Sequence, residues 1–372
     1  MPSEAIKGRE KLVVQIWEIL DVQSIYINSE RRIGKTTVLS ILEKEAREGW
    51  FPIKRDLENI HSVDHFAAVV YKDVEHFLDG RQVVERKAKS FIDSMKGIEI
   101  GGIIKLPEGN PVPWKTLLEK AIQDLHANFK TQEDRLLFLW DEVPFMLENI
   151  SSRAGESVAM EVLDVLRYLR QTYAGIRMIL TGSIGLHHVL TRLKGSGYSN
   201  APINDMASVD VNPFSREDAT ALAFRLLQGE GVVGDDLNVS ARVIAECTDD
   251  FPYYIHHLVR QLRFAGKGCS PELIQELLTS QLVDPNDPWE LQHYRTRIST
   301  YYGTNENLTL GVLDELALCE VSMPFDTLLT ALKNVVKVDD KEQLRLVLKQ
   351  LQRDHYIRSS EGGYRFAFGI VK

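Results

Sequence analysis

A short loop between a β-prone run and a helical run constrains the fold of this chain more than any other feature. Residues 24–27 (SIYI) favour a strand, and apolar residues at helical spacing resume at Val38. Between them, residues 29–36 read SERRIGKT, which fits seven of the eight positions of the pattern G-x-x-x-x-G-K-[ST], with Ser29 in place of the first glycine. A strand, a loop and a helix in this order open an α/β unit, so we predict an α/β fold with a parallel sheet.

The loop also predicts a chemistry. Its backbone N–H groups and the N-terminus of the following helix would form a positive concavity for phosphate. Gly34 lets the backbone approach a ligand closely, Lys35 can reach the β- and γ-phosphates, and Thr36 can offer its hydroxyl to Mg²⁺. A chance GKT sequence before a helix is the alternative, but the flanking strand and helix favour a nucleotide site. The residues expected to contact the nucleotide here are Arg32, Ile33, Gly34, Lys35, Thr36 and Thr37.

A second motif lies about 100 residues downstream. Residues 136–140 (LLFLW) form a continuous apolar run, typical of a central parallel strand buried on both faces, and Asp141 and Glu142 follow it. We predict that Asp141 holds Mg²⁺, through water, and that Glu142 orients and deprotonates the attacking water. A solvated strand end capped by acids is the alternative. Ser183 ends the next apolar run and is predicted to contact the γ-phosphate or the water, which completes a catalytic set with Lys35 and Glu142.

The 372 residues divide into three regions. Strand and helix patterns alternate up to about residue 210, with a small hairpin expected at 98–104, and this alternation predicts a doubly wound parallel sheet. Helical patterns alone follow, and the chain ends in three helices and a glycine-turned hairpin, the pattern of a winged helix. We therefore predict an α/β core over 1–210, a helical lid over 211–300 and a winged-helix domain over 301–372.

Composition excludes several classes of protein. Hydrophobic residues make up 44% of the chain and charged residues 26%, which argues against disorder. The three cysteines form no CxxC pair, so neither a zinc ribbon nor a disulfide framework is expected. No apolar run approaches the roughly 18–20 residues of a membrane span, and the N-terminus lacks the pattern of a signal peptide. These observations predict a cytoplasmic protein without membrane association.

The order and spacing of the motifs resemble the archaeal-type branch of P-loop ATPases, which belongs with the STAND and AAA-related NTPases near the origin-recognition-type initiators. In that family the G-R-E signature lies near the adenine, which implies that role for Gly8 and Arg9, and a G-x-P element implies that Pro252 faces the nucleotide. Asp249 and Asp250 depart from the family, which usually carries glycines there. The matching stretches are residues 8–10, 31–36, 140–142, 181–183, 211–215 and 250–254.

The resemblance implies an enzyme that binds ATP with Mg²⁺ and hydrolyses it to ADP and phosphate, with the lid closing over the nucleotide. It further implies a nucleotide-driven switch that controls self-association or binding of a partner protein, and family context suggests a mobile-element or antiviral defence system. Related ATPases often complete the site with an arginine supplied in trans. The sequence does not choose among the candidates for that arginine, which are Arg31, Arg32, Arg153 and Arg192.

The C-terminal region supports a second interpretation, an ATP-dependent DNA-binding initiator or regulator that uses the winged helix. Basic residues recur every four positions at Lys341, Arg345, Lys349 and Arg353, near one helix face. However, residues 308–372 contain nine basic and nine acidic residues, and the whole chain carries a net charge of −9. DNA binding is therefore open but not favoured by charge. A scaffold with a vestigial nucleotide site, which the altered Ser29 allows, is a third interpretation.

Overall fold

The chain folds into two compact units. The computed structural model describes residues 8–79, 113–129, 133–182, 186–195, 201–336 and 340–372. One unit, called the sheet unit, contains Leu12–Asn28 and Thr36–Asp210. The other, called the helical unit, contains Ser29–Lys35, Val211–Lys372 and the described part of Met1–Lys11. The hairpin predicted at 98–104 lies outside the described residues.

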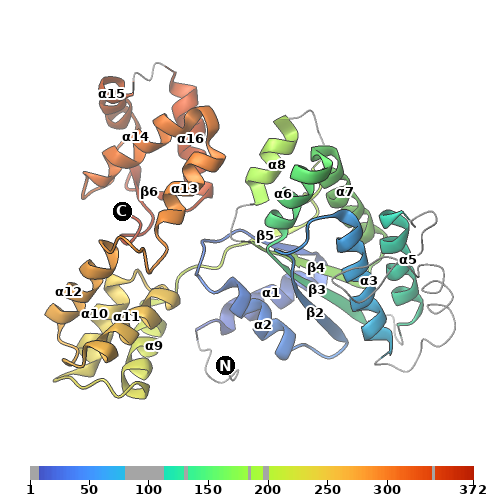
Figure 1. The fold of residues 1–372 in the computed structure, drawn as a ribbon, viewed down its shortest axis with the longest axis horizontal. Coiled ribbons are helices and arrows are strands. Elements are labelled where there is room, and N and C mark those ends of the chain that lie inside the picture. Colours follow the sequence, from blue (N-terminus) through green and yellow to red (C-terminus); the bar gives the residue numbers. More distant parts are fainter. Residues whose placement is uncertain (1–7, 80–112, 130–132, 183–185, 196–200, 337–339) are drawn as a thin grey trace. The chain divides into compact units, whose positions relative to one another are not determined.

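The sheet unit is built on five parallel strands in the order β2-β3-β4-β1-β5 (Figure 1). The sequence patterns predict four of them, at residues 24–27, 50–56, 136–140 and 176–183. The fifth, β5, was not predicted because its sequence (ASV) lacks the β-prone apolar run seen at residues 24–27; it pairs with β1 at the edge of the sheet, with Ile25 opposite Ala207. The strands are β1 (Ile25–Ile27), β2 (Trp50–Asp56), β3 (Arg135–Asp141), β4 (Ile176–Leu180) and β5 (Ala207–Val209).

Helices cover both sides of this sheet. Figure 1 shows α1 and α2 on one side of the strands and α3 and α5 on the other. Such coverage is what a parallel sheet requires, because its crossover connections place helices on its faces. The helices are α1 (Glu10–Val22), α2 (Lys35–Lys44), α3 (Val63–Asp79), α5 (Trp114–Ala127), α6 (Val143–Ala154), α7 (Glu156–Thr172) and α8 (Leu186–Gly195).

Strand β3 is buried on both faces, as its continuous apolar sequence predicts. Leu136, Phe138 and Trp140 point into one core, which they share with residues of α3, α5, α6, α7 and α8. The alternate residues Leu137 and Leu139 point to the opposite face and are also fully buried. This burial fixes the end of β3, and with it the position of the acidic pair that follows.

The helical unit begins with four helices whose starts carry local signals. Ser215 accepts a hydrogen bond from the backbone N–H of Asp218 at the start of α9, and Asp236 and Ser270 cap the next helices in the same way. Pro252 occupies the first turn of α11, where its missing N–H costs nothing. The four helices are α9 (Arg216–Gly229), α10 (Leu237–Cys247), α11 (Pro252–Ala265) and α12 (Pro271–Leu282).

The C-terminal part of the helical unit has the arrangement of a winged helix. Four helices pack on a shared apolar core together with an antiparallel hairpin, and the last three of them are the helices predicted from the sequence. The hairpin turns at Glu361 and Gly362, both with positive φ, as tight hairpin turns require. The elements are α13 (Gln292–Tyr301), a short 3₁₀ helix (Gly303–Asn305), α14 (Glu306–Ala317), α15 (Phe325–Val335), α16 (Lys341–Arg353), β6 (Ile357–Ser360) and β7 (Gly363–Phe366).

None of the helices in the described ranges combines the length and the apolar character needed to cross a lipid bilayer.

Candidate nucleotide-binding site

The predicted phosphate loop follows β1 and leads into α2, which begins at Lys35. Gly34 has a φ of 100°, a conformation that favours glycine, and Arg32 has a φ of 65°. The buried Lys35 ammonium donates to the backbone carbonyls of Ser29 at 3.0 Å and Glu30 at 2.8 Å. The backbone of the loop therefore accepts hydrogen bonds from the ammonium of Lys35, the group that is predicted to bind phosphate.

The residue after Lys35 is bonded directly to the predicted metal-binding acid. The Thr36 hydroxyl donates to Asp141 Oδ2 at 2.6 Å, although 105 positions separate the two residues. Asp141 is buried at the end of β3, and its other oxygen accepts the backbone N–H of Glu142 at 3.1 Å. A hydroxyl and a carboxylate oxygen side by side are the ligand types that Mg²⁺ prefers. The two residues predicted as metal ligands thus fit that ion.

Glu142 stands between β3 and α6 in an unusual backbone conformation. Its φ of 57° is left-handed, and it occupies the N-cap position of α6. Gly182, after β4, closely approaches the same turn, because a Cβ added there would lie 2.5 Å from Pro144 and 3.5 Å from Glu142 Oε2. The Glu142 carboxylate is thereby placed beside the end of β4. Ser183, the third predicted catalytic residue, lies outside the described residues.

The strand order explains this clustering. β4 lies between β1, which leads to the phosphate loop, and β3, which ends in the acidic pair. All three strands are parallel, so their carboxyl ends meet at one edge of the sheet. Ligands of open α/β sheets bind at this edge, outside the carboxyl ends of the strands.

Gly8 and Arg9, the predicted adenine-side residues, contact other residues of the helical unit. Gly8 has a φ of 94° and packs against Asp218, whose Cβ would lie 3.0 Å from an added side chain. The buried Arg9 guanidinium donates to the backbone carbonyls of Asn212 at 2.6 Å and Ile33 at 2.8 Å. Burial lowers the pKa of Arg9 to about 10, and the charge of Asp218 opposes this shift. Arg9 therefore stays charged at neutral pH and joins Ile33 to Asn212, which precedes α9.

Arg32 is engaged by residues that precede α13. Its guanidinium donates to the backbone carbonyl of Trp289 at 2.7 Å and forms an ion pair with Glu290. The same group lies over the Tyr253 ring, 4.0 Å from its centre. The neighbouring Ile33 is fully buried, whereas Thr36 is exposed and Thr37 partly exposed. Arg32 is thus held by contacts within the chain. Contact of Arg32 and Thr37 with a nucleotide stays a prediction.

Asp249 and Asp250, the two aspartates predicted to alter the lid hinge, adopt a backbone conformation that favours glycine. Asp249 and Asp250 have φ values of 49° and 61°, immediately before Pro252 and its helix. The Asp249 carboxylate accepts the backbone N–H of Ile370 at 2.6 Å, and Asp250 pairs with Arg216 at 2.9 Å. Burial raises the pKa of Asp249, and hydrogen bonds to its carboxylate oppose the rise. The carboxylates thus gain partners that offset part of the backbone cost.

Sequence reasoning missed three residues that hold the loop. The hydroxyl of Ser29 accepts the backbone N–H of Val211, so the serine adds a bond that glycine cannot make. Glu30 is buried and pairs with Arg297 of α13 at 3.0 Å. No local signal marks these roles, because Glu30 occupies a variable position of the loop pattern and 267 positions separate it from its partner.

Comparison with solved structures identifies the fold. The Walker-type ATPase PABY2304 of Pyrococcus abyssi superposes with a TM-score of 0.64, at 17% identity, over 99% of this chain and 95% of that protein. This chain has the fold of a P-loop ATPase. The ORC2 protein of Aeropyrum pernix, in ADPNP–ADP complexes, matches with a TM-score of 0.56 and 12% identity over 97% of this chain and 90% of that one. The predicted fold class, a P-loop parallel sheet with a helical lid and a C-terminal winged helix, is confirmed.

Comparison of sequences alone gives little. No protein-family model matches this chain. A curated protein of Erwinia tasmaniensis (strain DSM 17950 / CFBP 7177 / CIP 109463 / NCPPB 4357 / Et1/99), described as 4-hydroxy-tetrahydrodipicolinate synthase, is 26% identical over 164 residues. The match covers 44% of this chain and 47% of that protein, so the chain spans less than half of that relative's length.

Proposed function

We propose that this protein binds ATP with Mg²⁺ and hydrolyses it to ADP and phosphate. The observation that carries the proposal is the hydrogen bond between Thr36 and Asp141, which joins the end of the phosphate loop to the acidic strand end. A chance GKT sequence would have no reason to contact the acid of a second motif. The likeness in fold to ATPases at 17% identity or less supports the architecture, and the side chains support the chemistry.

We assign each residue of the candidate site a role according to its position. Lys35 and the loop N–H groups would bind the phosphates, and Thr36 and Asp141 would hold Mg²⁺. Mg²⁺ held by these residues would neutralise charge that develops on the leaving group. The Glu142 carboxylate would accept the proton of the attacking water, and its place at the end of the buried β3 keeps it in position. Pro252, Gly8 and Arg9 would complete the nucleotide contacts.

We further propose that hydrolysis drives a switch in which the helical unit changes its binding of a partner protein or of another copy of this chain. A mobile-element or antiviral defence system is the setting we propose. The same proposal places the protein in the cytoplasm, where ATP is available and thiols stay reduced. Cys247, Cys269 and Cys319 are all unpaired, which fits such a compartment.

Replacing Asp141 by asparagine tests the metal site. We expect Mg²⁺-dependent ATP turnover of the full chain to fall by about 10- to 100-fold, the usual cost of losing a group that supports a metal. Asp21→Asn is the matched control, because Asp21 is an exposed aspartate outside the candidate site, where it forms a surface pair with Arg47. Turnover by the unaltered chain that persists after chelation of divalent ions would contradict the metal assignment. Equal turnover by Asp141→Asn and Asp21→Asn would contradict it as well.

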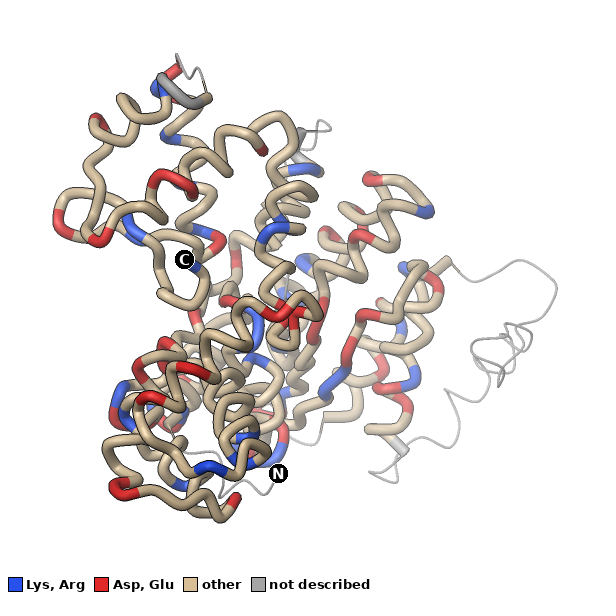
Figure 2. Tube along the Cα trace, turned by 60° about the vertical axis from the view of Figure 1, so that its left-hand side comes forward, with Lys and Arg blue, Asp and Glu red and all other residues tan. Residues whose placement is uncertain are grey.

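A second candidate function, ATP-dependent binding of DNA by the winged helix, is favoured by specific features of the structure. Lys341, Arg345, Lys349 and Arg353 are all exposed on α16. In the hairpin, Arg358 lies directly opposite Arg365, and both are exposed. Like charges opposite each other destabilise a hairpin unless an anion lies near. Against this, acidic residues are mixed with the basic ones over the same region (Figure 2).

This second function predicts a salt-sensitive affinity for duplex DNA. Charge reversal to glutamate at Lys341, Arg345, Lys349 and Arg353 together should abolish binding, because each lost phosphate contact removes about 0.9 from the slope of log affinity against log salt. A control variant with the same net charge reverses four exposed basic residues of the lid region, Arg225, Arg242, Arg260 and Lys267. Fluorescence anisotropy at low salt measures both. No binding by the unaltered chain, or an equal loss in both variants, would dismiss this function.

A further inference from the structure

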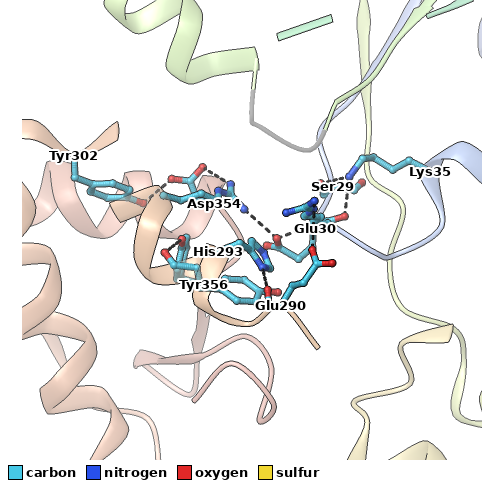
Figure 3. Close-up of polar contacts among 11 residues, drawn as sticks. Ser29, Glu30, Lys35, Glu290, His293, Tyr302, Asp354 and Tyr356 are labelled. Atoms are coloured by element: carbon cyan, nitrogen blue, oxygen red, sulfur yellow. Dashed lines mark hydrogen bonds and ion pairs between the residues drawn. The ribbon is translucent and has the colours of Figure 1, made fainter. Parts of the chain in front are cut away.

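A buried network of charged and hydroxyl groups joins the phosphate loop to the C-terminal helices (Figure 3). We call Glu30, Arg297, Asp354 and Tyr302 the loop brace. Arg297 lies at its centre: one nitrogen of its guanidinium pairs with Glu30 at 3.0 Å and another with Asp354 at 3.5 Å. The Tyr302 hydroxyl donates to Asp354 at 2.5 Å. Asp354 directly follows α16, so the brace runs from the loop to the winged helix.

The loop brace is deeply buried. The side chains of Glu30, Arg297 and Asp354 are only 2%, 12% and 1% exposed. Burial lowers the pKa of Arg297, but the nearby acidic groups, Glu30 foremost, outweigh it and raise the pKa above its usual value. Burying three charges is expensive, and apolar residues of similar volume often stabilise a protein as well or better. Stability alone is therefore a weak reason for this arrangement.

Glu30 connects the brace to the predicted phosphate-binding lysine. Its carboxylate Oε1, which pairs with Arg297, also accepts the backbone N–H of Arg31 at 2.9 Å. Its backbone carbonyl accepts the Lys35 ammonium at 2.8 Å. A single residue of the loop thus contacts both Arg297 and Lys35. A displacement of the loop at Glu30 would be transmitted to both groups.

We propose that Arg297 is a positioning residue for the phosphate loop, and that its second ion pair, with Asp354, couples nucleotide binding to the winged helix. The inference rests on the proposed function, because the loop must bind a nucleotide for the coupling to matter. Phosphate oxygens compete with the carbonyls of Ser29 and Glu30 for the Lys35 ammonium. A bound nucleotide therefore changes the bonds of Glu30, and Arg297 passes that change to Asp354.

The planar guanidinium suits this role. It offers several N–H donors in a rigid fork, so one group can pair with two acids at once. A lysine at this position would keep the charge but would present one compact ammonium. Coupling between two sites is also reciprocal, so altering Asp354 should change nucleotide affinity even though Asp354 is not part of the loop.

The test compares Arg297→Met with Arg295→Met in the full chain. Arg295 is exposed on the same helix, two residues away. Isothermal titration with ADP should show about 10- to 100-fold weaker binding for Arg297→Met, and for Asp354→Asn about 5- to 10-fold weaker binding, with Arg295→Met unchanged. In the unaltered chain, ADP should also alter hydrogen exchange in residues 341–360. At saturating ADP, that response should be absent from Arg297→Met.

Arg297→Lys separates positioning from folding. It keeps the positive charge, so it should fold, as judged by thermal melting, and bind ADP with intermediate affinity while losing the exchange response at 341–360. If Arg297→Met does not fold, this variant carries the test. Binding and exchange responses like those of the unaltered chain in both variants would overturn the inference and leave the proposed function standing. An unaltered chain that binds no nucleotide would overturn the proposed function, and the inference with it.

Discussion

Replacing Lys35 by alanine is expected to remove ATP binding, with a loss of affinity of at least about 100-fold. The ammonium is buried and is the only side-chain cation that the loop pattern requires. Truncating one partner of a buried, hydrogen-bonded charge pair costs about 2–5 kcal/mol, and each 1.4 kcal/mol is tenfold in affinity. The same change leaves the carbonyls of Ser29 and Glu30 without their present donor. Titration calorimetry with ATP and Mg²⁺ measures the loss.

Lys44→Ala is the matched control for this prediction. Lys44 is exposed in the last turn of the same helix, so its removal tests whether losing any lysine from α2 weakens binding. A thermal melt of Lys35→Ala similar to that of the unaltered chain would show that the fold survives. If a folded Lys35→Ala variant bound ATP as tightly as the Lys44→Ala variant, the loop would not be the phosphate site.

Much of the sheet could be predicted because its signals are local. The apolar run 136–140 specifies a strand buried on both faces, and β3 is buried in that way. The helices of the winged helix and the glycine-turned hairpin likewise follow from periodicity and turn residues within a few positions. Strand β5 shows the limit, since its sequence (ASV) has no β-prone apolar run and its pairing with β1 is a tertiary contact.

The residues of the candidate site that could be predicted are those that belong to known sequence motifs. Thr36 and Asp141 were each predicted as a Mg²⁺ ligand because each belongs to a known motif, and the structure brings them into contact across 105 positions. Glu30, Arg297 and Asp354 belong to no such pattern. Charged residues are usually exposed, so nothing in the sequence distinguishes these from surface residues. Their burial is a product of the tertiary fold alone.

The unusual residues at the two predicted turns show a further limit. Ser29 could be identified from the sequence as a change at the loop entrance, but not as an acceptor for the backbone N–H of Val211. Asp249 and Asp250 could be identified as replacements of glycine, but not as residues that adopt positive φ themselves. In both cases a polar side chain gains a backbone or ionic partner from a distant segment. These hydrogen bonds and ion pairs form with residues that are distant in the sequence, so no local sequence pattern predicts them.

Glu142→Gln is expected to keep ATP affinity while lowering turnover by about 10²- to 10⁴-fold, the usual contribution of a general base. Glutamine has the same shape and keeps the N-cap position of α6, so the left-handed backbone at this residue is retained. It cannot accept a proton from water, so bound ATP should persist unhydrolysed. Single-turnover phosphate release and chromatography of the bound nucleotide measure rate and trapping separately.

The contrast between the two variants identifies the mechanism. Lys35→Ala should lose ATP binding, because Lys35 is proposed to bind phosphate. Glu142→Gln should bind ATP without hydrolysing it, because Glu142 is proposed to accept the proton of the attacking water. Glu43→Gln, at an exposed glutamate of α2, is the control for charge loss. Turnover of Glu142→Gln equal to that of Glu43→Gln would remove Glu142 from the mechanism. Turnover like that of the unaltered chain in both Lys35→Ala and Glu142→Gln would contradict hydrolysis at this site, because neither the phosphate contact nor the proton acceptor would then be needed.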